Sequence, residues 1–496
     1  MQRLQEQRAR IICNNIRAGR LNRDGHDKND IGESDDGLQR WLSMDPRKDL
    51  ETMLGDPKKA IRSMAVPLIF SYLIVQVNIF ADTSWCSGLG ADASSAVSSI
   101  SPIYWIVSGL GTGIGVGAST AIARCLGRGE RSKAESLAVQ TVVLSLIISV
   151  AFTPVLFILI DPVVIGIGAE DVIGLCEAYI YPIVLLMVFV IMEGTVSGIL
   201  RSEGAAKSSM IMLCLSATVN MVLDPLLIYG AGLGLAGAGL ATGLATVFSS
   251  ALGLYWCLSG KSYVRLSFRG FRFKRREIWD ILYVGIPRAT ESILVSMMSL
   301  IQRVFVIACG GMAGAMFYNI PWRFVSLACV ISMAVGAAMI PVCSAALGRK
   351  DMDKAMTAYR YSILISVSFM SIIAAMLFIF SDLCVIPFTY SPTMEELRPE
   401  FAHVLRIYAP MVVCMAFVDM GSSMLQALRR AQISMVSSFI RNLVIVMILW
   451  YASTVSMDAI YYGLMISEVF GGALMMYLAH VEMDRYRRSN SVTSPE

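Results

Sequence analysis

Apolar residues fall into long blocks that are separated by short polar segments. Most blocks run for about 20 to 28 residues, the length that an α-helix needs to cross a hydrocarbon layer roughly 30 Å thick. In lipid the backbone must satisfy its own hydrogen bonds, and a barrel strand needs only about 10 alternating residues, so blocks of this length predict helices. The pattern predicts an all-α integral membrane protein. Twelve transmembrane helices are expected, at residues 60–83, 97–122, 136–160, 175–200, 208–229, 236–258, 280–306, 315–345, 358–380, 400–427, 432–452 and 457–480.

Charge distribution gives these helices a direction in the membrane. Of the 496 residues, 56% are hydrophobic and only 16% are charged, and the Lys and Arg residues follow every second apolar block. Residues 261–276 form the most basic loop, whereas residues 161–171 and 381–400 are acidic. By the positive-inside rule the basic loops and both termini are cytoplasmic, which requires an even number of spans. We expect a multi-pass protein of the plasma (inner) membrane.

The second half of the chain repeats the first about 220 residues later. Leu126-Gly-Arg corresponds to Leu347-Gly-Arg, and the segment from Asn220 corresponds to the segment from Asn442. The repeat predicts two pseudo-symmetric lobes of six helices, 54–258 and 280–480, a basic cytoplasmic linker at 259–279, and polar cytoplasmic tails at 1–53 and 481–496. A surface helix near residues 38–54 is an alternative for the first tail. Internal repeats of this kind build the two sides of a central site in transporters.

Four oxygen-bearing side chains are predicted to reach a similar depth near the outer side. They are Asp82, Asn220, Asp224 and Thr242, and Asn220 lies one helical turn from Asp224. An ionised acid in lipid costs several kcal/mol unless it faces water, binds a cation or holds a proton. These residues are therefore a candidate site for a coupling cation, either H⁺ or Na⁺. The alternative is that the acids cap helix ends or face outer water, and that Asn220 and Thr242 only join neighbouring helices.

Prolines and further acids lie inside other predicted spans. Pro67, Pro225 and Pro287 each remove a backbone donor, which predicts helix kinks that either serve a conformational change or are inherited packing features. Carboxylates inside the spans, of which Glu193 and Asp419 hold nearly corresponding places in the two lobes, could line a substrate cavity or form ion pairs with Arg303 or Arg441. These acids are Glu193, Asp419 and Glu291.

The residue pattern gives little indication of an enzyme active site or a cofactor site. The three histidines lie far apart without metal-ligand spacing, and no arrangement of residues suggests a nucleophile. The 11 cysteines show no paired spacing and are interpreted as apolar fillers with reduced thiols. We expect no enzyme activity, no cofactor, and no nucleic-acid partner. An ion channel is disfavoured because a duplicated bundle with acids on one side does not form a symmetric pore.

Several stretches together resemble the multidrug and toxic compound extrusion (MATE) family from about Leu54 to His480. They are Ala65-Val-Pro67, Asp82-Thr-Ser-Trp, Gly115-Val-Gly-Ala-Ser, Leu126-Gly-Arg-Gly, Leu200-Arg-Ser-Glu-Gly204, the segment from Asn220 to Tyr229, Gly285-Ile-Pro287 and Leu347-Gly-Arg349. The resemblance implies two six-helix lobes arranged as a V, and we expect a monomer. It also implies export of organic cations in exchange for H⁺ or Na⁺.

The residues match the DinF-like branch of that family, in which acids of the first lobe act. On this resemblance Tyr179 joins Asp82, Asn220, Asp224 and Thr242 in the cation site. The branch with a sodium-carrying acid in the second lobe fits less well, because Glu291 stands only four residues after Pro287. The alternative function is a flippase for lipid-linked oligosaccharides or peptidoglycan precursors. Its basic cavity would use Arg288, Arg303 and Arg441 to hold pyrophosphate.

Overall fold

The computed structural model describes residues 45–166, 170–389 and 395–491, and every regular element in these ranges is a helix. Eleven helices are long and apolar enough to cross a membrane. A twelfth span consists of two shorter helices that meet at an angle of 55°. The prediction of an all-α protein with twelve transmembrane helices is confirmed.

The first half of the chain contains six spans. They are α4 (Pro57–Ser87), α5 (Ala91–Gly127), α6 (Arg131–Gly166), the bent pair α7 (Ile173–Leu185) and α8 (Met187–Ser202), α9 (Ala206–Pro225) and α10 (Gly234–Ser259). A short 3-10 helix, η1 (Glu170–Val172), precedes α7, and a π-helical turn, η2 (Leu226–Gly230), follows α9. The predicted fourth span is thus broken, because Leu186 has φ −95° and ψ 11° between α7 and α8.

The second half begins with α11 (Arg275–Gly348), which contains two spans. They are separated at Gly311, whose φ of 62° is not helical. The remaining elements are α12 (Met352–Ile379), α13 (Ser381–Val385), η3 (Ile386–Phe388), α15 (Arg398–Ala427), α16 (Ala431–Ala452) and α17 (Met457–Ser491).

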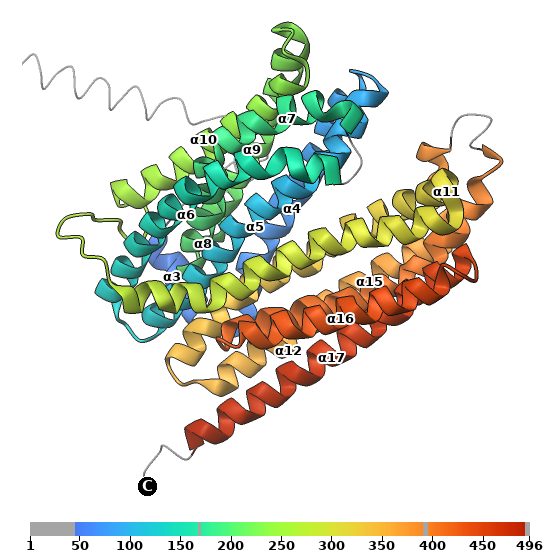
Figure 1. The fold of residues 1–496 in the computed structure, drawn as a ribbon. Coiled ribbons are helices and arrows are strands. Elements are labelled where there is room, and N and C mark those ends of the chain that lie inside the picture. The colour runs from blue at the N-terminus through green and yellow to red at the C-terminus, as the bar shows by residue number, and fades with distance from the viewer. Residues whose placement is uncertain (1–44, 167–169, 390–394, 492–496) are drawn as a thin grey trace, which may run out of the picture. The chain divides into compact units, whose positions relative to one another are not determined.

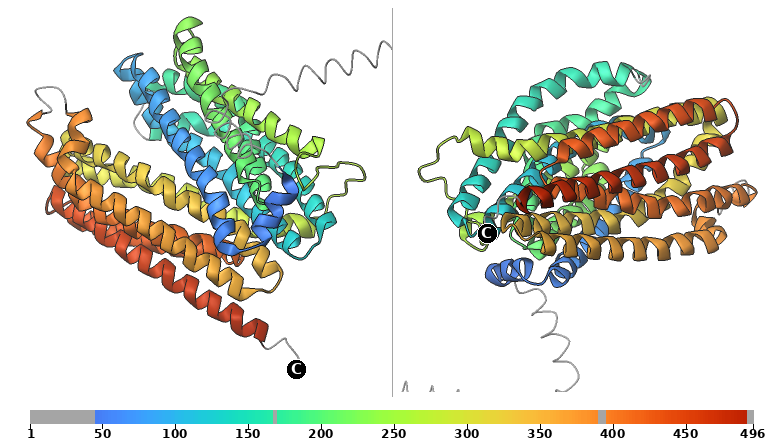
Figure 2. Two further views of the ribbon diagram at one scale, coloured as in Figure 1. Left: turned by 180° about the vertical axis from the view of Figure 1, so that it is seen from behind. Right: turned by 90° about the horizontal axis from the view of Figure 1, so that it is seen from below.

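Within residues 45–491 the two halves form two bundles that meet at one end and diverge toward the other (Figures 1 and 2). They meet where the basic loops lie, which we call the basic-loop end. There Arg124 donates a hydrogen bond from Nη2 to the carbonyl oxygen of Ala427 at 2.7 Å. Arg349 donates from Nε to the carbonyl oxygen of Gly127 at 3.0 Å. These bonds join the halves where the bundles touch.

Glycines on opposite faces of α5 allow it to pack between α8 and α11. A Cβ on Gly117 would overlap the carbonyl oxygen of Ile281 in α11, whereas a Cβ on Gly115 would overlap that of Gly194 in α8. Only glycine permits such close backbone approach. The motif Gly115-Val-Gly therefore places α5 at the centre of the fold, in contact with both halves.

The repeat is visible in the turns as well as in the helices. Gly129 after α5 has φ 76°, and Lys350, at the corresponding place after α11, has φ 61°. Gly204 after α8 has φ 85°, and Arg429, the residue in the same position after α15, has φ 61°. Left-handed residues commonly end helices and satisfy the last carbonyls. The second half keeps these turns although it has lost the glycines.

The ends of the bundle differ from the predicted boundaries. Most of the predicted tail 1–53 lies outside the described residues, but α3 (Pro46–Leu54) is an ordered helix whose Leu50 and Met53 are buried. Asp45 caps it by accepting a hydrogen bond from the Arg47 N–H at 3.1 Å. At the other end α17 continues to Ser491, well beyond residue 480. The apolar positions of α3 explain why it packs against the bundle.

Candidate functional site

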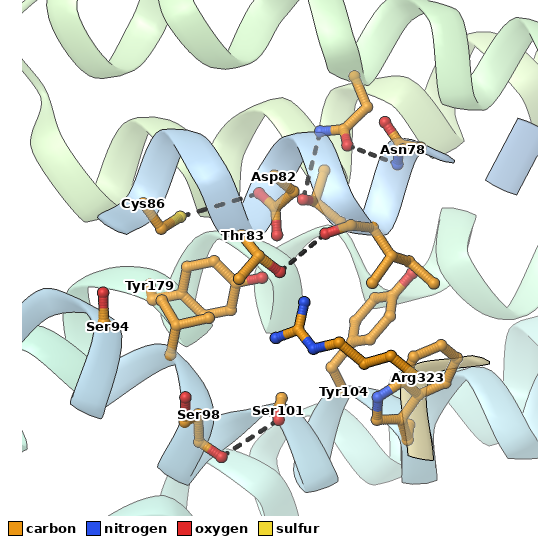
Figure 3. A pocket seen from close by; sticks show the side chains of 15 residues that line it. Asn78, Asp82, Thr83, Cys86, Ser94, Ser98, Ser101, Tyr104, Tyr179 and Arg323 are labelled. Atoms are coloured by element: carbon orange, nitrogen blue, oxygen red, sulfur yellow. Dashed lines mark hydrogen bonds between the residues drawn. The ribbon is translucent and has the colours of Figure 1, made fainter. Parts of the chain in front are cut away.

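A cavity of about 250 Å³ lies mainly in the first half, near the ends of α4 and α9 that are distant from the basic loops (Figure 3). Predicted site residues from four helices line it, namely Asp82 of α4, Tyr179 of α7, Asn220 of α9 and Thr242 of α10. The remaining lining residues are Asn78, Ile79, Thr83, Cys86, Ser94, Val97, Ser98, Ser101, Tyr104, Trp105 and Arg323. The sequence-based prediction of a shared depth thus agrees with the lining of one cavity.

A chain of hydrogen bonds leads from the cavity wall to Asp224. Asn78 donates from Nδ2 to Oδ1 of Asn220 at 2.8 Å (Figure 3). The Asn220 amide nitrogen then donates to Oδ1 of Asp224 at 3.0 Å and to Oγ1 of Thr242 at 3.4 Å. Asn220 and Asp224 can meet because residues four apart share one helix face. The amide of Asn220 therefore links helices α4, α9 and α10.

Asp224 is fully buried directly behind this wall. Its second carboxylate oxygen, Oδ2, has no hydrogen-bond partner among the described residues. Asp224 is followed by Pro225, the last residue of α9, and by the π-helical turn of η2. Tyr229 in that turn donates from its hydroxyl to the carbonyl oxygen of Trp85 at 2.6 Å, which ties it to α4. A buried acid with a free oxygen can accept a proton or a cation.

Asp82 is the acid on the cavity wall itself and is half-buried. The thiol of Cys86 lies 3.9 Å from its Oδ1, a weak contact. None of the ion pairs in the described part of the chain includes Asp82 or Asp224. Charges without a partner inside a membrane bundle indicate a functional site.

Aromatic and hydroxyl groups form the other walls. Tyr179 is buried in α7, and a Cβ on Gly239 of α10 would overlap its carbonyl oxygen. This close approach brings Tyr179 and Thr242 to the same cavity. Tyr104 and Trp105 of α5 stack edge to face, with ring centroids 5.6 Å apart. Such rings can pack against the face of an organic cation.

The three predicted substrate acids do not line this cavity. Glu291 forms an ion pair with Arg288 at 3.1 Å. Asp419 accepts a short hydrogen bond from the hydroxyl of Ser332. Arg441, suggested as a partner for these acids, pairs instead with Glu468 at 3.1 Å.

Glu193 of α8 is also absent from the cavity lining, and its Oε1 has no partner within the described ranges. The predicted kink residues Pro67 and Pro287 lie inside α4 and α11. Pro225 stands where α9 changes to the π-helical turn. Of the three prolines, only Pro225 borders the site.

Sequence reasoning missed several cavity residues, of which Asn78 and Arg323 matter most. Asn78 stands four residues before Asp82, so the i, i+4 rule would have placed both on one face. Arg323 is a cation within the predicted span 315–345, and a charge at that depth is itself a signal. Its position next to first-half residues could not be predicted from the sequence, because it depends on how the two halves pack together.

Comparison with known proteins identifies the family. The family model MatE matches residues 67–226 and 287–452, one segment in each half. The chain belongs to the MatE family. A MatE relative, the multidrug export protein MepA of Staphylococcus saprophyticus, is 26% identical over 441 residues, which are 86% of this chain and 94% of that protein.

Solved structures of related transporters agree with the fold. One is an outward-facing conformation of a multidrug resistance MATE family transporter of the MOP superfamily, with a TM-score of 0.84 and 28% identity over 88% of this chain and 98% of that chain. Another is a MOP superfamily transporter from Pyrococcus furiosus, with a TM-score of 0.85 and 28% identity over 89% and 99% of the two chains. That transporter is described as having a binding pocket of reverse polarity, which suggests a different function.

Proposed function

We propose that this MatE protein is a secondary active multidrug exporter that moves organic cations outward by antiport with H⁺ or Na⁺. The carrying observation is the pair of acids, Asp82 on the cavity wall and Asp224 directly behind it, without a paired cation in the described structure. A relative named as a multidrug export protein and a solved multidrug resistance transporter support this function. The protein is a transporter and not an enzyme.

The cavity favours a cationic aromatic substrate. Asp82 supplies negative charge, while Tyr104, Trp105 and Tyr179 supply ring surfaces. A cation over an aromatic face gains about 0.5 to 2 kcal/mol, more when water is excluded. The Pyrococcus relative shows that pocket polarity is taken as an indicator of function in this superfamily. The acids of this chain therefore favour organic cations.

The flippase alternative loses the residues on which it depended. Arg288 and Arg441 are paired with Glu291 and Glu468, so their charges are already neutralised. Arg303 does not line the cavity. A pyrophosphate group would require several free basic side chains at one place.

Exchange follows from competition for the same acids. When Asp82 and Asp224 are ionised, the cavity attracts an organic cation; when a coupling cation neutralises them, the substrate is released. The proton suits the arrangement better than Na⁺, because the amide N–H groups of Asn220 point toward Asp224 and Thr242, where an ion would need oxygen ligands. Sodium binding at Asp82, Asn220, Asp224 and Thr242 would require the Asn220 amide to turn over.

Transport into proteoliposomes tests this function. Purified protein should drive uptake or release of ethidium under an imposed proton gradient, an imposed sodium gradient, or both. Asp82→Asn and Asp224→Asn should abolish gradient-driven movement while the protein still folds and reconstitutes. Normal transport in both variants would remove the acids from the mechanism, and absence of ethidium movement in the wild type under either gradient would contradict the proposed function.

The orientation belongs to the same proposal. We place the basic-loop end and both termini in the cytoplasm of a plasma-membrane monomer, on the positive-inside rule. Ser267 is exposed in the basic loop between α10 and α11. In a background without other reactive cysteines, Ser267→Cys should react with an impermeant thiol reagent only from the inside. Labelling in intact cells would reverse the topology.

A further inference from the structure

Arg323 brings a positive charge from the second half into the first-half cavity. It lies in the second span of α11, nine residues after Gly314, where that span begins. Its exposed side chain extends into the cavity toward Thr83 and Tyr179 (Figure 3). Among the described residues that line the cavity, it is the one cation and Asp82 is the one acid.

The charge of Arg323 has no acidic partner of its own. The ion pairs within the described ranges do not include it. Its guanidinium carbon lies over the ring of Phe80, 5.5 Å from the ring centroid. An arginine deep in a membrane span is costly unless water or opposite charge compensates it. We expect this compensation to come from solvent in the cavity and from the carboxylate of Asp82, which lines the same cavity.

We propose that Arg323 is a specificity-determining residue that limits the positive charge the cavity accepts. With Asp82 and Asp224 ionised and Arg323 protonated, the net charge is −2 + 1 = −1. One added positive charge, either a coupling cation or a monovalent organic cation, makes the cavity neutral. A divalent cation, or a substrate together with a coupling cation, leaves a net positive charge. This inference rests on the proposed export function and names its substrate class as monovalent cations.

The same charge count explains how exchange stays coupled. Without Arg323 the two acids could hold a substrate and a coupling cation together, and nothing would force one to leave when the other binds. With Arg323 present, binding of one disfavours the other. The other titratable side chains on the wall, Cys86, Tyr104 and Tyr179, carry no charge in their ordinary neutral forms. They do not alter the count.

Two compounds of nearly equal shape but different charge test the proposal. 1-Methyl-4-phenylpyridinium carries one positive charge, and methyl viologen carries two on a similar two-ring frame. Equilibrium binding of each is measured on purified full-length protein in detergent, so that the test does not depend on a gradient. We expect the wild type to prefer the monovalent compound, because the cost of removing a cation from water rises with the square of its charge, whereas its attraction to a cavity of net charge −1 rises only in proportion to that charge. Proton release in weakly buffered solution should be at most one per bound monovalent molecule.

Arg323→Gln removes the charge and keeps most of the side chain. It should strengthen monovalent binding by about 3- to 30-fold, the range for loss of one charge near a partly solvated site. For the divalent compound, the logarithm of the fold-change in affinity should be about twice as large, because Coulomb energy is proportional to ligand charge. Arg323→Lys keeps the charge and should retain the wild-type preference.

Two control variants separate charge from packing. Arg303→Gln removes an exposed cation of α11 that does not line the cavity and should leave the preference unchanged. Phe80→Leu removes the ring under Arg323 but keeps the charge, and should also keep the preference.

An equal change for both compounds in Arg323→Gln, or the same shift in Phe80→Leu, would overturn the proposal. If Arg323→Gln does not fold, release of two protons per monovalent molecule by the wild type would overturn it. Failure of the wild type to bind either compound would instead contradict the export function itself.

Discussion

The two halves share a backbone design but differ in what they do with polar side chains. In the first half, the Asn220 amide nitrogen donates to Asp224 and Thr242. At the corresponding place in the second half, Asn442 is buried and its amide nitrogen has no partner among the described residues. Val446 stands where the first half has Asp224. The two halves therefore share helices and turns, whereas the hydrogen bonds made by Asn220 have no counterpart at the Asn442 amide nitrogen among the described residues.

Charges show the same division. In the second half, Arg288 and Glu291 are paired at 3.1 Å, and Arg441 and Glu468 at 3.1 Å. In the first half, no cation is paired with Asp224 in the described structure. A paired charge is already neutralised and contributes to packing, whereas an unpaired acid must exchange protons or cations with its surroundings. We therefore propose that the two paired second-half cations support structure, while the first-half acids, together with Arg323, which is unpaired in the described structure, carry the chemistry.

Among matched variants of the two halves, the largest expected effect on transport comes from the two corresponding asparagines. Asn220→Leu removes hydrogen bonds to a buried acid and to Thr242, each worth about 1 to 3 kcal/mol when the partner stays buried. We expect the initial rate of transport to fall by about 10- to 100-fold, since each 1.4 kcal/mol corresponds to a factor of ten. Rates are measured in proteoliposomes at equal protein density.

Asn442→Leu is the matched control for that change. It removes an amide whose nitrogen makes no hydrogen bond within the described ranges, so transport should stay near the wild-type rate and stability should be unchanged or higher. Equal loss of transport in both variants would show that the halves share the polar function, and the comparison would then fail.

The sequence was informative where function depends on local pattern. Block length, alternating basic loops and the repeat predicted the twelve-helix fold, and the cost of charge in lipid selected Asp82 and Asp224. Position within a helix was enough to place Asn220 beside Asp224. These inferences need only the geometry of one helix and its depth in the membrane.

Features that depend on contacts between distant segments could not be predicted in this way. Glu193 and Asp419 have nearly corresponding places in the repeat, yet neither lines the cavity. Arg323 reaches the first-half cavity because of the angle at which the bundles meet, which no single helix encodes. The helix α3 was interpreted mainly as tail because the surface that it packs against lies far away in the sequence, at the turn near Gly204. A Cβ on Gly204 would lie only 2.7 Å from the Asp49 carbonyl oxygen of α3.

A second test asks whether the charges of the second half only support its structure. The side chains of Arg441 and Glu468 are 12% and 8% exposed. Removing one partner of a buried pair leaves an uncompensated charge and typically costs about 3 to 5 kcal/mol. Arg441→Met alone should therefore lower thermal stability strongly. The double variant Arg441→Met with Glu468→Met should recover most of it and should still transport. A stable double variant without transport would give the second half a chemical role.

A third difference lies at the turns after α8 and α15. Glu203 in the first half is fully buried and accepts hydrogen bonds from the Ser262 hydroxyl at 2.8 Å and the Val264 N–H at 2.7 Å. Leu428 occupies the corresponding turn of the second half. Burial raises the pKa of Glu203 from 4.5 to about 7, although both hydrogen bonds oppose the shift. Glu203 thus holds the basic loop through these two hydrogen bonds, and its contribution to the free energy of unfolding depends on pH.

The sign of that dependence follows from the raised pKa. Between about pH 4.5 and 7 the folded protein holds a proton that the unfolded chain has lost, so stability falls as pH rises, by about 3 kcal/mol in total. Glu203→Gln should remove this part of the slope when unfolding temperatures are compared at pH 5 and pH 8. Glu135→Gln, which alters a more exposed carboxylate paired with Arg131, should keep it. An unchanged slope in Glu203→Gln would exclude titration of this anchor.

The smallest expected effect concerns the position that distinguishes the halves most directly. A charge midway along a membrane helix costs about 2.5 to 3.5 kcal/mol on insertion scales. Val446→Asp should cost less, about 1 to 2 kcal/mol, because the Asn442 amide nitrogen, unpartnered among the described residues, lies one turn away and can donate to the new carboxylate. Expression of Val446→Asp should fall slightly. The double variant Val446→Asp with Asn442→Leu lacks the donor amide, so it should bear the full cost of about 2.5 to 3.5 kcal/mol and express less well.

Coupling should not respond to Val446→Asp at all. Val446 does not line the cavity that carries Asp82 and Thr242, so an added acid there would not join the proposed coupling site. Proton and sodium dependence of transport, measured with separate gradients, should therefore match the wild type. In an Asp224→Val background, Val446→Asp should fail to restore transport. Restoration would mean that either half can carry the coupling acid, and that the loss of Asp from the second half is an accident of the repeat rather than a division of labour.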